Sequence, residues 1–146
     1  MRKKRAKKRI LLPDPKFGNT TVTRFVNNLM LDGKKSTAFK VFYNALNSIA
    51  EKIQDEEALV VFQKALENVM PHVEVRSRRI GGATFQIPMQ IRPARKVSMA
   101  MSWMIKFARK RNEKSMAEKL AYEILAAYKE EGASIKKKTE VHRMAE

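Results

Sequence analysis

The chain has 146 residues, 44% of them hydrophobic, and it carries 31 Lys and Arg against 15 Asp and Glu, a formal net charge of +16. This length can bury a core, and we expect a single domain over residues 1–146. The chain has no cysteine, which excludes disulfides, thiolate catalysis and cysteine-ligated metal sites. No run approaches the ~20 apolar residues of a membrane span, so we expect a cytoplasmic protein.

The positive charge is not confined to one end of the chain. Seven basic residues lie within the first nine, and the remaining chain still has 24 basic against 15 acidic residues, a net charge of +9. Such an excess opposes compaction, so the fold does not require it. It indicates a polyanionic partner, which is RNA, DNA or an anionic membrane surface.

Residues 1–12 are predicted to be a basic extension. Their first nine residues read MRKKRAKKR, with dense like charge and no helical or strand period. We expect this segment to be disordered until it meets a polyanion; a solubility or nuclear-import tail is the alternative. Pro13-Asp14-Pro15 stiffens the chain and marks the start of the folded body, residues 13–146.

Six segments of the body have apolar residues at steps of three and four, the pattern of amphipathic helices. Capping and breaking residues predict where each helix begins and ends. We expect helices from Asn19 or Thr20 to Asp32-Gly33, from about Lys35 to Gln54, from a cap at Asp55 to Pro71, from Pro93 to about Asn112, from a capping box at Ser115 and Glu118 to Gly132, and from Ser134 to the end.

Between the third and fourth of these helices, residues 73–91 alternate with a two-residue period around Gly81-Gly82. This pattern predicts a two-stranded β-hairpin that protrudes as an arm over residues 72–92. The fold class is therefore mainly α, a single-domain bundle of about six helices with an inserted hairpin.

Two registers of the hairpin are open. A two-residue Gly-Gly turn pairs Ile80 with Ala83 and sets apolar side chains against polar ones. An odd loop centred on Gly82 aligns the apolar faces, and we therefore favour it. The pairs of this register are Val73 with Ile91, Val75 with Met89 and Ser77 with Ile87. The opposite face, which is either solvated or in contact with nucleic acid, then carries Arg76, Arg78, Gln86, Gln90 and Arg92, with Arg79 near the tip.

The sequence offers no catalytic set, no cofactor motif and no metal site, so we expect a protein that is not an enzyme. His72 and His142 are seventy residues apart, without metal-ligand spacing, and are expected to be structural or solvated. The three aspartates, among them Asp14, lie at turns or caps where a local backbone role suffices. Gly81-Gly82 lacks the further glycine and the strand-to-helix context of a phosphate loop.

Charge is segregated along the body. Residues 36–71 hold three lysines against five acidic residues, whereas residues 72–111 hold ten basic residues against Glu74 alone. The hairpin and the fourth helix, together with the basic extension, are therefore predicted to form a nucleic-acid surface. The aromatic residues fit helical core positions, so contacts should be mainly with phosphate and shape. Basic residues that stand out at the ends of the arm and of the helices are Lys34, Lys35, Arg92, Arg95, Lys96, Arg109, Lys110, Arg111, Lys136, Lys137 and Lys138.

Several stretches carry a family resemblance. They are MRKKRAKKR, PDPKFGNTTVTRFVNNLMLDGKKS, ALENVMPHVEVRSRRIGGATFQIPMQIRPARK and SMAEKLAYEILAAYKEEGASIKKK. In this order and over the whole length, they closely resemble the family of the seventh protein of the small ribosomal subunit, bacterial type. One departure is the end at Met144-Ala145-Glu146, because relatives usually continue by several residues to an aromatic end, and C-terminal contacts with exit-site tRNA are therefore not carried over.

The resemblance implies a mostly helical fold with a protruding hairpin and a structural role in the small ribosomal subunit. It implies direct binding to the 3′ major domain of small-subunit ribosomal RNA, which nucleates assembly of the subunit head. It also implies a place at the subunit interface near the tRNA exit site, close to messenger RNA and to the ninth and eleventh small-subunit proteins. The hairpin tip, which is Ile80, Gly81, Gly82 and Ala83, would lie near the tRNA and the message.

The family's RNA contacts carry over to basic positions of this chain. They are Arg2, Lys3, Lys4, Arg5, Lys7, Lys8, Arg9, Lys34, Lys35, Arg76, Arg78, Arg79, Arg92, Arg95, Lys96, Arg109, Lys110, Arg111, Lys136, Lys137 and Lys138.

Two other functions compete with this interpretation. An architectural DNA-bending protein also suits a helical body with a basic β-arm, and Ile80 would be its apolar wedge. A nucleic-acid-modifying enzyme is disfavoured because no acid, base or metal set converges in the sequence.

Overall fold

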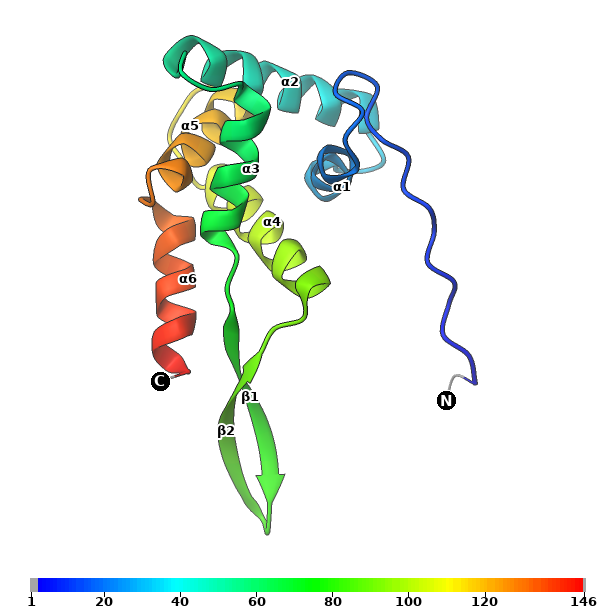
Figure 1. The fold of residues 1–146 in the computed structure, drawn as a ribbon, viewed down its shortest axis with the longest axis vertical. Helices are drawn as coiled ribbons and strands as arrows, with labels where there is room; N and C mark the ends of the chain where they lie inside the picture. The colour runs from blue at the N-terminus through cyan, green and yellow to red at the C-terminus, as the bar shows by residue number, and fades with distance from the viewer. Residues whose placement is uncertain (1–2, 146) are drawn as a thin grey trace.

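A computed structural model describes residues 3–145 of the chain (Figure 1). The helices are α1 Thr20–Leu29, α2 Lys35–Lys52, α3 Ala58–Val69, α4 Pro93–Arg109, α5 Met116–Tyr128 and α6 Ala133–Met144, and the strands are β1 Val73–Ile80 and β2 Ala83–Gln90. The expected mainly helical fold with an inserted antiparallel hairpin is confirmed. Residues 5–14 form neither helix nor strand.

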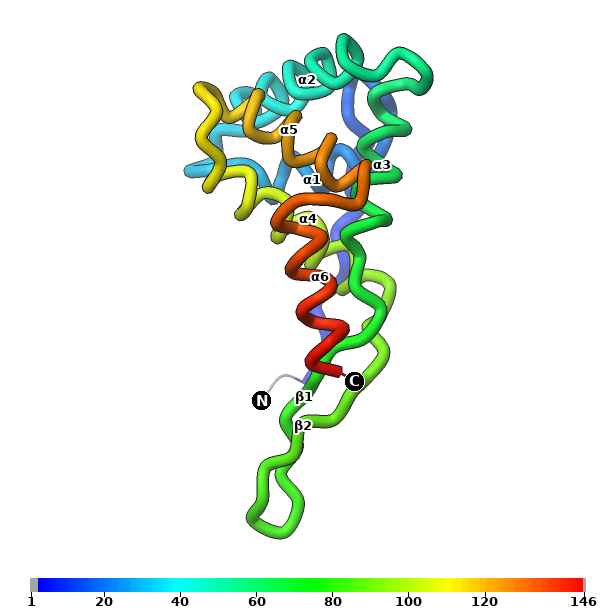
Figure 2. Tube along the Cα trace, turned by 90° about the vertical axis from the view of Figure 1, so that its left-hand side faces the viewer, coloured from blue at the N-terminus to red at the C-terminus, as the bar shows by residue number. Residues whose placement is uncertain are grey.

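The helices gather at one end of the molecule and the hairpin projects from the other (Figures 1 and 2). Helix α5 packs against α2, α3 and α4, so it occupies the middle of the bundle. Helix α6 runs beside the start of the hairpin and contacts β1 (Figure 2). The N-terminal segment extends down one side, separated from the hairpin in Figure 1.

The core is centred on three phenylalanines from three helices. Phe25 of α1, Phe42 of α2 and Phe62 of α3 are fully buried, and their ring centroids lie 5.0 to 5.4 Å apart. Such aromatic contacts stabilise a fold by about 0.5–1.5 kcal/mol per pair beyond the area they bury. The helical period of the apolar residues therefore predicts the core faces correctly.

Local signals set some helix ends and not others. The Asn19 side chain accepts a hydrogen bond from the Thr21 amide at 2.8 Å, so the expected cap of α1 is confirmed. The same helix ends at Leu29, and Asp32 and Gly33, both with positive φ, form the turn into α2 instead.

The prediction that Asp55 caps α3 is wrong. The helix begins after Glu57, and no side chain caps it. The physical reason is a long-range contact: the Glu56 carboxylate binds the Lys64 ammonium and the Tyr128 hydroxyl. This contact draws the chain away from the geometry that an Asp55 cap would need.

The register that we favoured for the hairpin is also wrong. Ile80 pairs with Ala83, Val75 with Pro88 and Ser77 with Gln86, as a two-residue turn requires. Gly81 and Gly82 have φ of +57° and +84°, which matches the turn type whose twist suits a tight hairpin. Most of both strands is exposed, so mismatched faces bury little and the turn decides the register.

The change of register mixes the two faces of the hairpin. Arg76 lies opposite Ile87 and Arg78 opposite Phe85, whereas Gln86 and Gln90 lie on the other face with the valines of β1. A purely polar face therefore does not exist. Strand β1 packs beside α6, and Glu74 near the root of the hairpin pairs with Arg95 of α4.

Within residues 3–145, no helix is long and apolar enough to span a bilayer.

Candidate nucleic-acid interface

The hairpin presents arginines beside exposed apolar side chains. Arg76, Arg78 and Arg79 are all exposed, and Phe85 and Met89 remain 52% and 46% exposed on the face that carries Arg76 and Arg78. One guanidinium group can bind two phosphate oxygens at once, and aromatic or thioether groups contact the faces of bases. The hairpin can therefore contact both the backbone and the unstacked bases of a nucleic acid.

A buried carboxylate joins the hairpin to α4 at its root. Both Nε and Nη2 of Arg95 donate to the Glu74 carboxylate at 2.9 Å, and Nε of Arg76 donates to it at 3.4 Å. The hydrogen bonds from Arg95 outweigh burial and hold the pKa of Glu74 below its usual value. Arg95 and Arg76 are thus already paired with the only acidic residue of residues 72–111.

Two turns add exposed basic side chains. Lys34 and Lys35 lie exposed where the chain enters α2, with Nζ of Lys35 5.9 Å from the centre of the Phe39 ring. Arg92 is the N-cap residue of α4, is exposed, and makes no side-chain capping bond. Because the first amides of a helix also favour anions, Arg92 and the start of α4 suit a phosphate group.

The three basic residues at the end of α4 do not share one environment. Arg109 donates to the Leu29 carbonyl at 3.3 Å. Arg111 donates to Glu123 at 2.8 Å and to Glu113 at 3.3 Å. Lys110, by contrast, is exposed.

Glu123, which Arg111 neutralises, is fully buried. Its carboxylate also accepts hydrogen bonds from the Ser134 hydroxyl at 2.7 Å and the Ser134 amide at 3.3 Å. The pair therefore ties the loop after α4 to α5 and to the start of α6. Arg111 has a structural partner that its place in a basic run does not indicate.

The lysines of α6 also differ in whether they have a partner within the protein. Lys138 donates to the Asn68 carbonyl of α3 at 2.9 Å, and the Asn68 amide donates to the carbonyls of Ala127 and Tyr128 at 3.1 and 3.3 Å. These bonds satisfy carbonyls at the ends of α3 and α5, where a cation is favourable. Lys136 is exposed and Lys137 is half-buried.

The N-terminal segment presents Lys3 to Arg9 as exposed side chains. Arg2, which the resemblance also indicates, lies outside the described residues. The basic charge of this segment stands apart from the hairpin (Figure 1), so the tail and the arm can reach different parts of one partner.

The loop that follows this segment is organised by Asp14. Its buried carboxylate accepts hydrogen bonds from the amides of Lys16, Phe17 and Asn19 and from the Tyr43 hydroxyl. Burial alone would raise the pKa of Asp14, but these hydrogen bonds more than offset it and lower the pKa below 3.8. Burial and the Asp14 carboxylate together raise the pKa of Tyr43 to about 12. The expected local backbone role of Asp14 is confirmed.

Lys16, which sequence reasoning did not select, lies on this ordered loop. Its ammonium is 5.3 Å from the centre of the Tyr43 ring and 5.6 Å from that of Phe17. Phe39 stacks on Tyr43 with centroids 5.6 Å apart. The sequence signal that could have found it is the lysine beside an aromatic residue in a turn held by aspartate.

The two histidines are neighbours in space. The Nε2 atom of His142 accepts a hydrogen bond from the His72 amide at 2.9 Å, and the rings lie 5.9 Å apart. They therefore help to dock α6 on the hairpin root, in line with the structural role expected of them. Residues 3–145 contain no cluster of three or more His, Cys, Asp or Glu side chains that could hold a metal ion.

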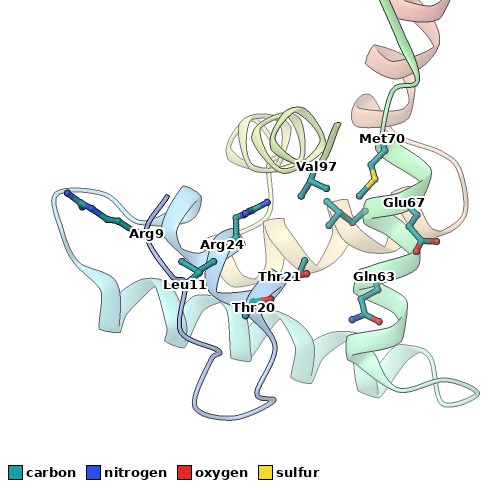
Figure 3. Close-up of a pocket in the computed structure, with 10 residues that line it drawn as sticks. Arg9, Leu11, Thr20, Thr21, Arg24, Gln63, Glu67, Met70 and Val97 are labelled. Atoms are coloured by element: carbon teal, nitrogen blue, oxygen red, sulfur yellow. The ribbon is translucent and has the colours of Figure 1, made fainter. Parts of the chain in front are cut away.

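A hollow of about 640 Å³ lies between the N-terminal segment, α1, α3 and α4 (Figure 3). Arg24 from α1, Val97 from α4 and Met70 from the end of α3 point into it from different sides. Gln63 of α3 and Thr21 of α1 add polar groups. No sequence pattern indicates this hollow, because four separate segments build it.

Comparison with known proteins agrees with the resemblance seen in the sequence. The family described as "Ribosomal protein S7p/S5e" matches residues 1–146. A "Small ribosomal subunit protein uS7" from Flavobacterium psychrophilum is 68% identical, over all of this chain and 94% of the relative. The protein of the same name from Christiangramia forsetii is 69% identical with the same coverage, and that from Bdellovibrio bacteriovorus is 51% identical over 99% of this chain and 92% of the relative.

Proposed function

Because the chain belongs to the ribosomal protein S7p/S5e family, we propose that it is a structural constituent of the small ribosomal subunit that binds small-subunit ribosomal RNA directly. The match over the full length of the chain carries this proposal. The net charge of +16 and the arrangement of basic side chains on the tail, the hairpin and the start of α4 support it, since contacts of this kind bind the phosphate backbone.

The proposal extends to where the protein acts in the subunit. It nucleates assembly of the head by binding the 3′ major domain, and it lies near the tRNA exit site with the ninth and eleventh small-subunit proteins as neighbours. The projecting hairpin supports this part, because its tip at Ile80 to Ala83 lies far from the bundle (Figure 1) and can reach tRNA or messenger RNA while the body stays on ribosomal RNA. Its role is binding, without catalysis.

The residues proposed to contact RNA fall into two groups. Arg76, Arg95, Arg109, Arg111 and Lys138 have intramolecular partners, so part of their effect on RNA binding is exerted through the fold. The group proposed for direct phosphate contact is Lys3 to Arg9, Lys34, Lys35, Arg78, Arg79, Arg92, Lys96, Lys110, Lys136 and Lys137.

Binding to a transcript of the 3′ major domain tests the function. The full chain should bind this RNA, resist equal concentrations of duplex DNA at the same salt, and co-sediment with the small subunit through a high-salt wash. Displacement by duplex DNA would favour the DNA-bending alternative, for which Ile80, 53% exposed at the tip, is the apolar wedge.

Shortening the hairpin tests its separate role. A variant in which residues 80–83 are replaced by a two-residue turn keeps Arg78 and Arg79. It should bind the 3′ major domain as the parent does and should alter retention of tRNA at the exit site of reconstituted ribosomes. Loss of ribosomal RNA binding in this variant would show that the tip belongs to the primary site.

A further inference from the structure

We propose that the hollow between the N-terminal segment, α1, α3 and α4 holds one unstacked nucleotide of the bound RNA, with Gln63 contacting the edge of the base and Arg24 its phosphate. This inference rests on the proposed function, because the nucleotide belongs to the ribosomal RNA. The ligand proposed for this hollow is a base, whereas the basic residues of the tail and the hairpin are proposed to contact phosphate.

The size and shape of the hollow fit this occupant. Its volume of about 640 Å³ falls within the range of about 300–1,000 Å³ typical of small-molecule sites. The hollow is open to solvent rather than enclosed, so a nucleotide can enter while its neighbours in the RNA strand remain outside.

The apolar part of the lining suits the face of a base. Leu66 is buried, and Met70 and Val97 are half-buried and pack against the core cluster. The Met70 thioether and the Val97 methyl groups both point into the hollow (Figure 3). A polarizable thioether makes favourable contacts with flat aromatic rings, and the desolvated floor favours a base over a hydrated phosphate.

The polar part of the lining has unused hydrogen-bonding groups. The side chains of Arg24 and Gln63 make no hydrogen bond or ion pair within residues 3–145, although both border the hollow. An amide can donate to and accept from a base edge at the same time. Arg24 presents a guanidinium fork of the kind that binds phosphate. Glu67, the acidic residue of the lining, extends from α3 away from Val97 (Figure 3).

These three features together match the parts of a nucleotide. An apolar floor takes the base face, an amide the base edge, and a guanidinium group at the rim the phosphate. Recognition of single-stranded loops and bulges by splayed bases is the common mode for RNA. The competing occupant is a protein segment. Its binding in the hollow would not require the Gln63 amide or the Arg24 guanidinium group.

The test couples a protein change to an RNA change. Gln63→Leu keeps side-chain size and removes the amide without altering charge, and Gln54→Leu, at an exposed position after α2, is its matched control. Affinity is measured for 3′ major domain RNA and for RNAs with a single abasic substitution at each unpaired position of the segment that the protein protects.

We expect one abasic position to weaken binding of the parent chain by about tenfold, the range expected when a stacked base is removed. Gln63→Leu should weaken binding of the intact RNA about fivefold, but should have no effect on the RNA abasic at that position. Gln54→Leu should bind every RNA as the parent does. Equal binding by the Gln63 and Gln54 variants, or a Gln63 effect that is the same for every abasic RNA, would overturn the proposal.

A second variant guards against misfolding of the first. Arg24 is exposed, so Arg24→Gln should leave thermal unfolding unchanged. Arg24→Gln should bind the unmodified RNA more weakly than the parent does. When a neutral methylphosphonate replaces one phosphate beside the abasic-sensitive nucleotide, the parent and Arg24→Gln should bind that RNA with equal affinity. If Arg24→Gln couples to no single phosphate, the pocket does not hold a nucleotide. If the parent chain fails to bind the RNA at all, it is the proposed function that fails.

Discussion

At the scale of single residues, Lys110 and Arg111 show why a basic side chain cannot be assigned to RNA from its neighbours in sequence. They are adjacent, but Lys110 is exposed whereas Arg111 neutralises the fully buried Glu123. Removing Arg111 leaves a buried carboxylate without its charged partner, and this is much more destabilising than removing a solvated charge.

We therefore expect two alanine variants to differ in which property they lose, stability or RNA affinity. Arg111→Ala should lower the free energy of unfolding by about 3 kcal/mol. Lys110→Ala should lower it by less than about 1 kcal/mol, the size of a helix-end charge effect, and should mainly reduce RNA affinity. Urea denaturation and equilibrium RNA binding measure the two quantities. Equal stability of both variants would contradict a structural role for the Arg111–Glu123 pair.

Asp14 makes the loop before α1 sensitive to acid. Its pKa in the folded protein is lowered from an ordinary value of 3.8, so its ionised form stabilises the fold above that value. This contribution is lost as the pH falls through the lower folded pKa. The free energy of unfolding of the parent should exceed that of Asp14→Asn by a constant amount above about pH 5, and the difference should shrink below pH 3.8.

The same variant reports on Tyr43. Ultraviolet titration of the tyrosines should include one that ionises near pH 12, and Asp14→Asn should lower the pKa of that group because the neighbouring negative charge is gone. Tyr43→Phe identifies the group by removing it. A tyrosine titration that Asp14→Asn leaves unchanged would mean that the hydrogen bond between these side chains is not formed in solution.

At the scale of elements, the hairpin is held at its root and exposed along its length. Glu74 with Arg95, and His142 with the His72 amide, tie its base to α4 and α6. Beyond this base, the only contacts among the described residues that hold the hairpin together are its cross-strand pairs and the Gly81-Gly82 turn. A two-stranded ribbon without a covered face is marginal by itself, so the turn and the anchored root carry its stability.

Cross-linking can verify the register of the hairpin. Cysteines introduced at Ser77 and Gln86, which are paired, should oxidise readily to a disulfide, because directly opposed positions have suitable Cβ distances. Cysteines at Ser77 and Ile87, which point to opposite faces in this register, should form a disulfide poorly. Mass spectrometry after mild oxidation measures both yields, and a higher yield for the second pair would support the odd-loop register.

At the scale of the whole molecule, charge is separated between segments of the chain. The body segment 36–71 has five acidic residues against three lysines, whereas residues 1–9 and 72–111 together hold 17 basic residues against Glu74 alone. We therefore expect attraction to RNA to orient the protein as well as to bind it, with the hairpin and tail toward the nucleic acid.

Deleting residues 1–9 should flatten the dependence of RNA affinity on salt. For each phosphate that the seven basic residues neutralise in the parent complex, the deletion should reduce the slope of log affinity against log salt by about 0.7–0.9. Lys40→Gln combined with Lys52→Gln, on exposed positions of α2, is the control and should leave the slope unchanged. An unchanged slope in the deletion would show that the tail does not bind phosphate.

We expect residues 13–146 to unfold as one cooperative unit, because α5 packs against three other helices and the core is continuous across them. Trp103 of α4 is the only tryptophan, so its fluorescence reports on that helix, whereas far-ultraviolet circular dichroism reports on all the helices. The two urea transitions should coincide. Separate midpoints would divide the body into two domains.

Much of the fold follows from local properties of the chain. Helices are predictable because an apolar residue every three or four positions defines a buried stripe whatever lies opposite it. Phe25, Phe42 and Phe62 are therefore identified as core before their contacts are known. The hairpin is predictable because alternation and two glycines are properties of neighbouring residues, and the total charge is a property of composition.

The tertiary structure decided what depends on residues far apart in the chain. Glu74 and Arg95 are 21 positions apart, Asn68 and Lys138 are 70 apart, and the hollow beside Gln63 is built by four segments. Because of such contacts, Arg95, Arg111 and Lys138 have partners within the protein and are not simply available to RNA. The packing of separate segments also creates a pocket that no sequence motif indicates. The register was open for a related reason: the apolar pattern selects a register only where a face is buried, and here the turn prevailed because the strands are exposed.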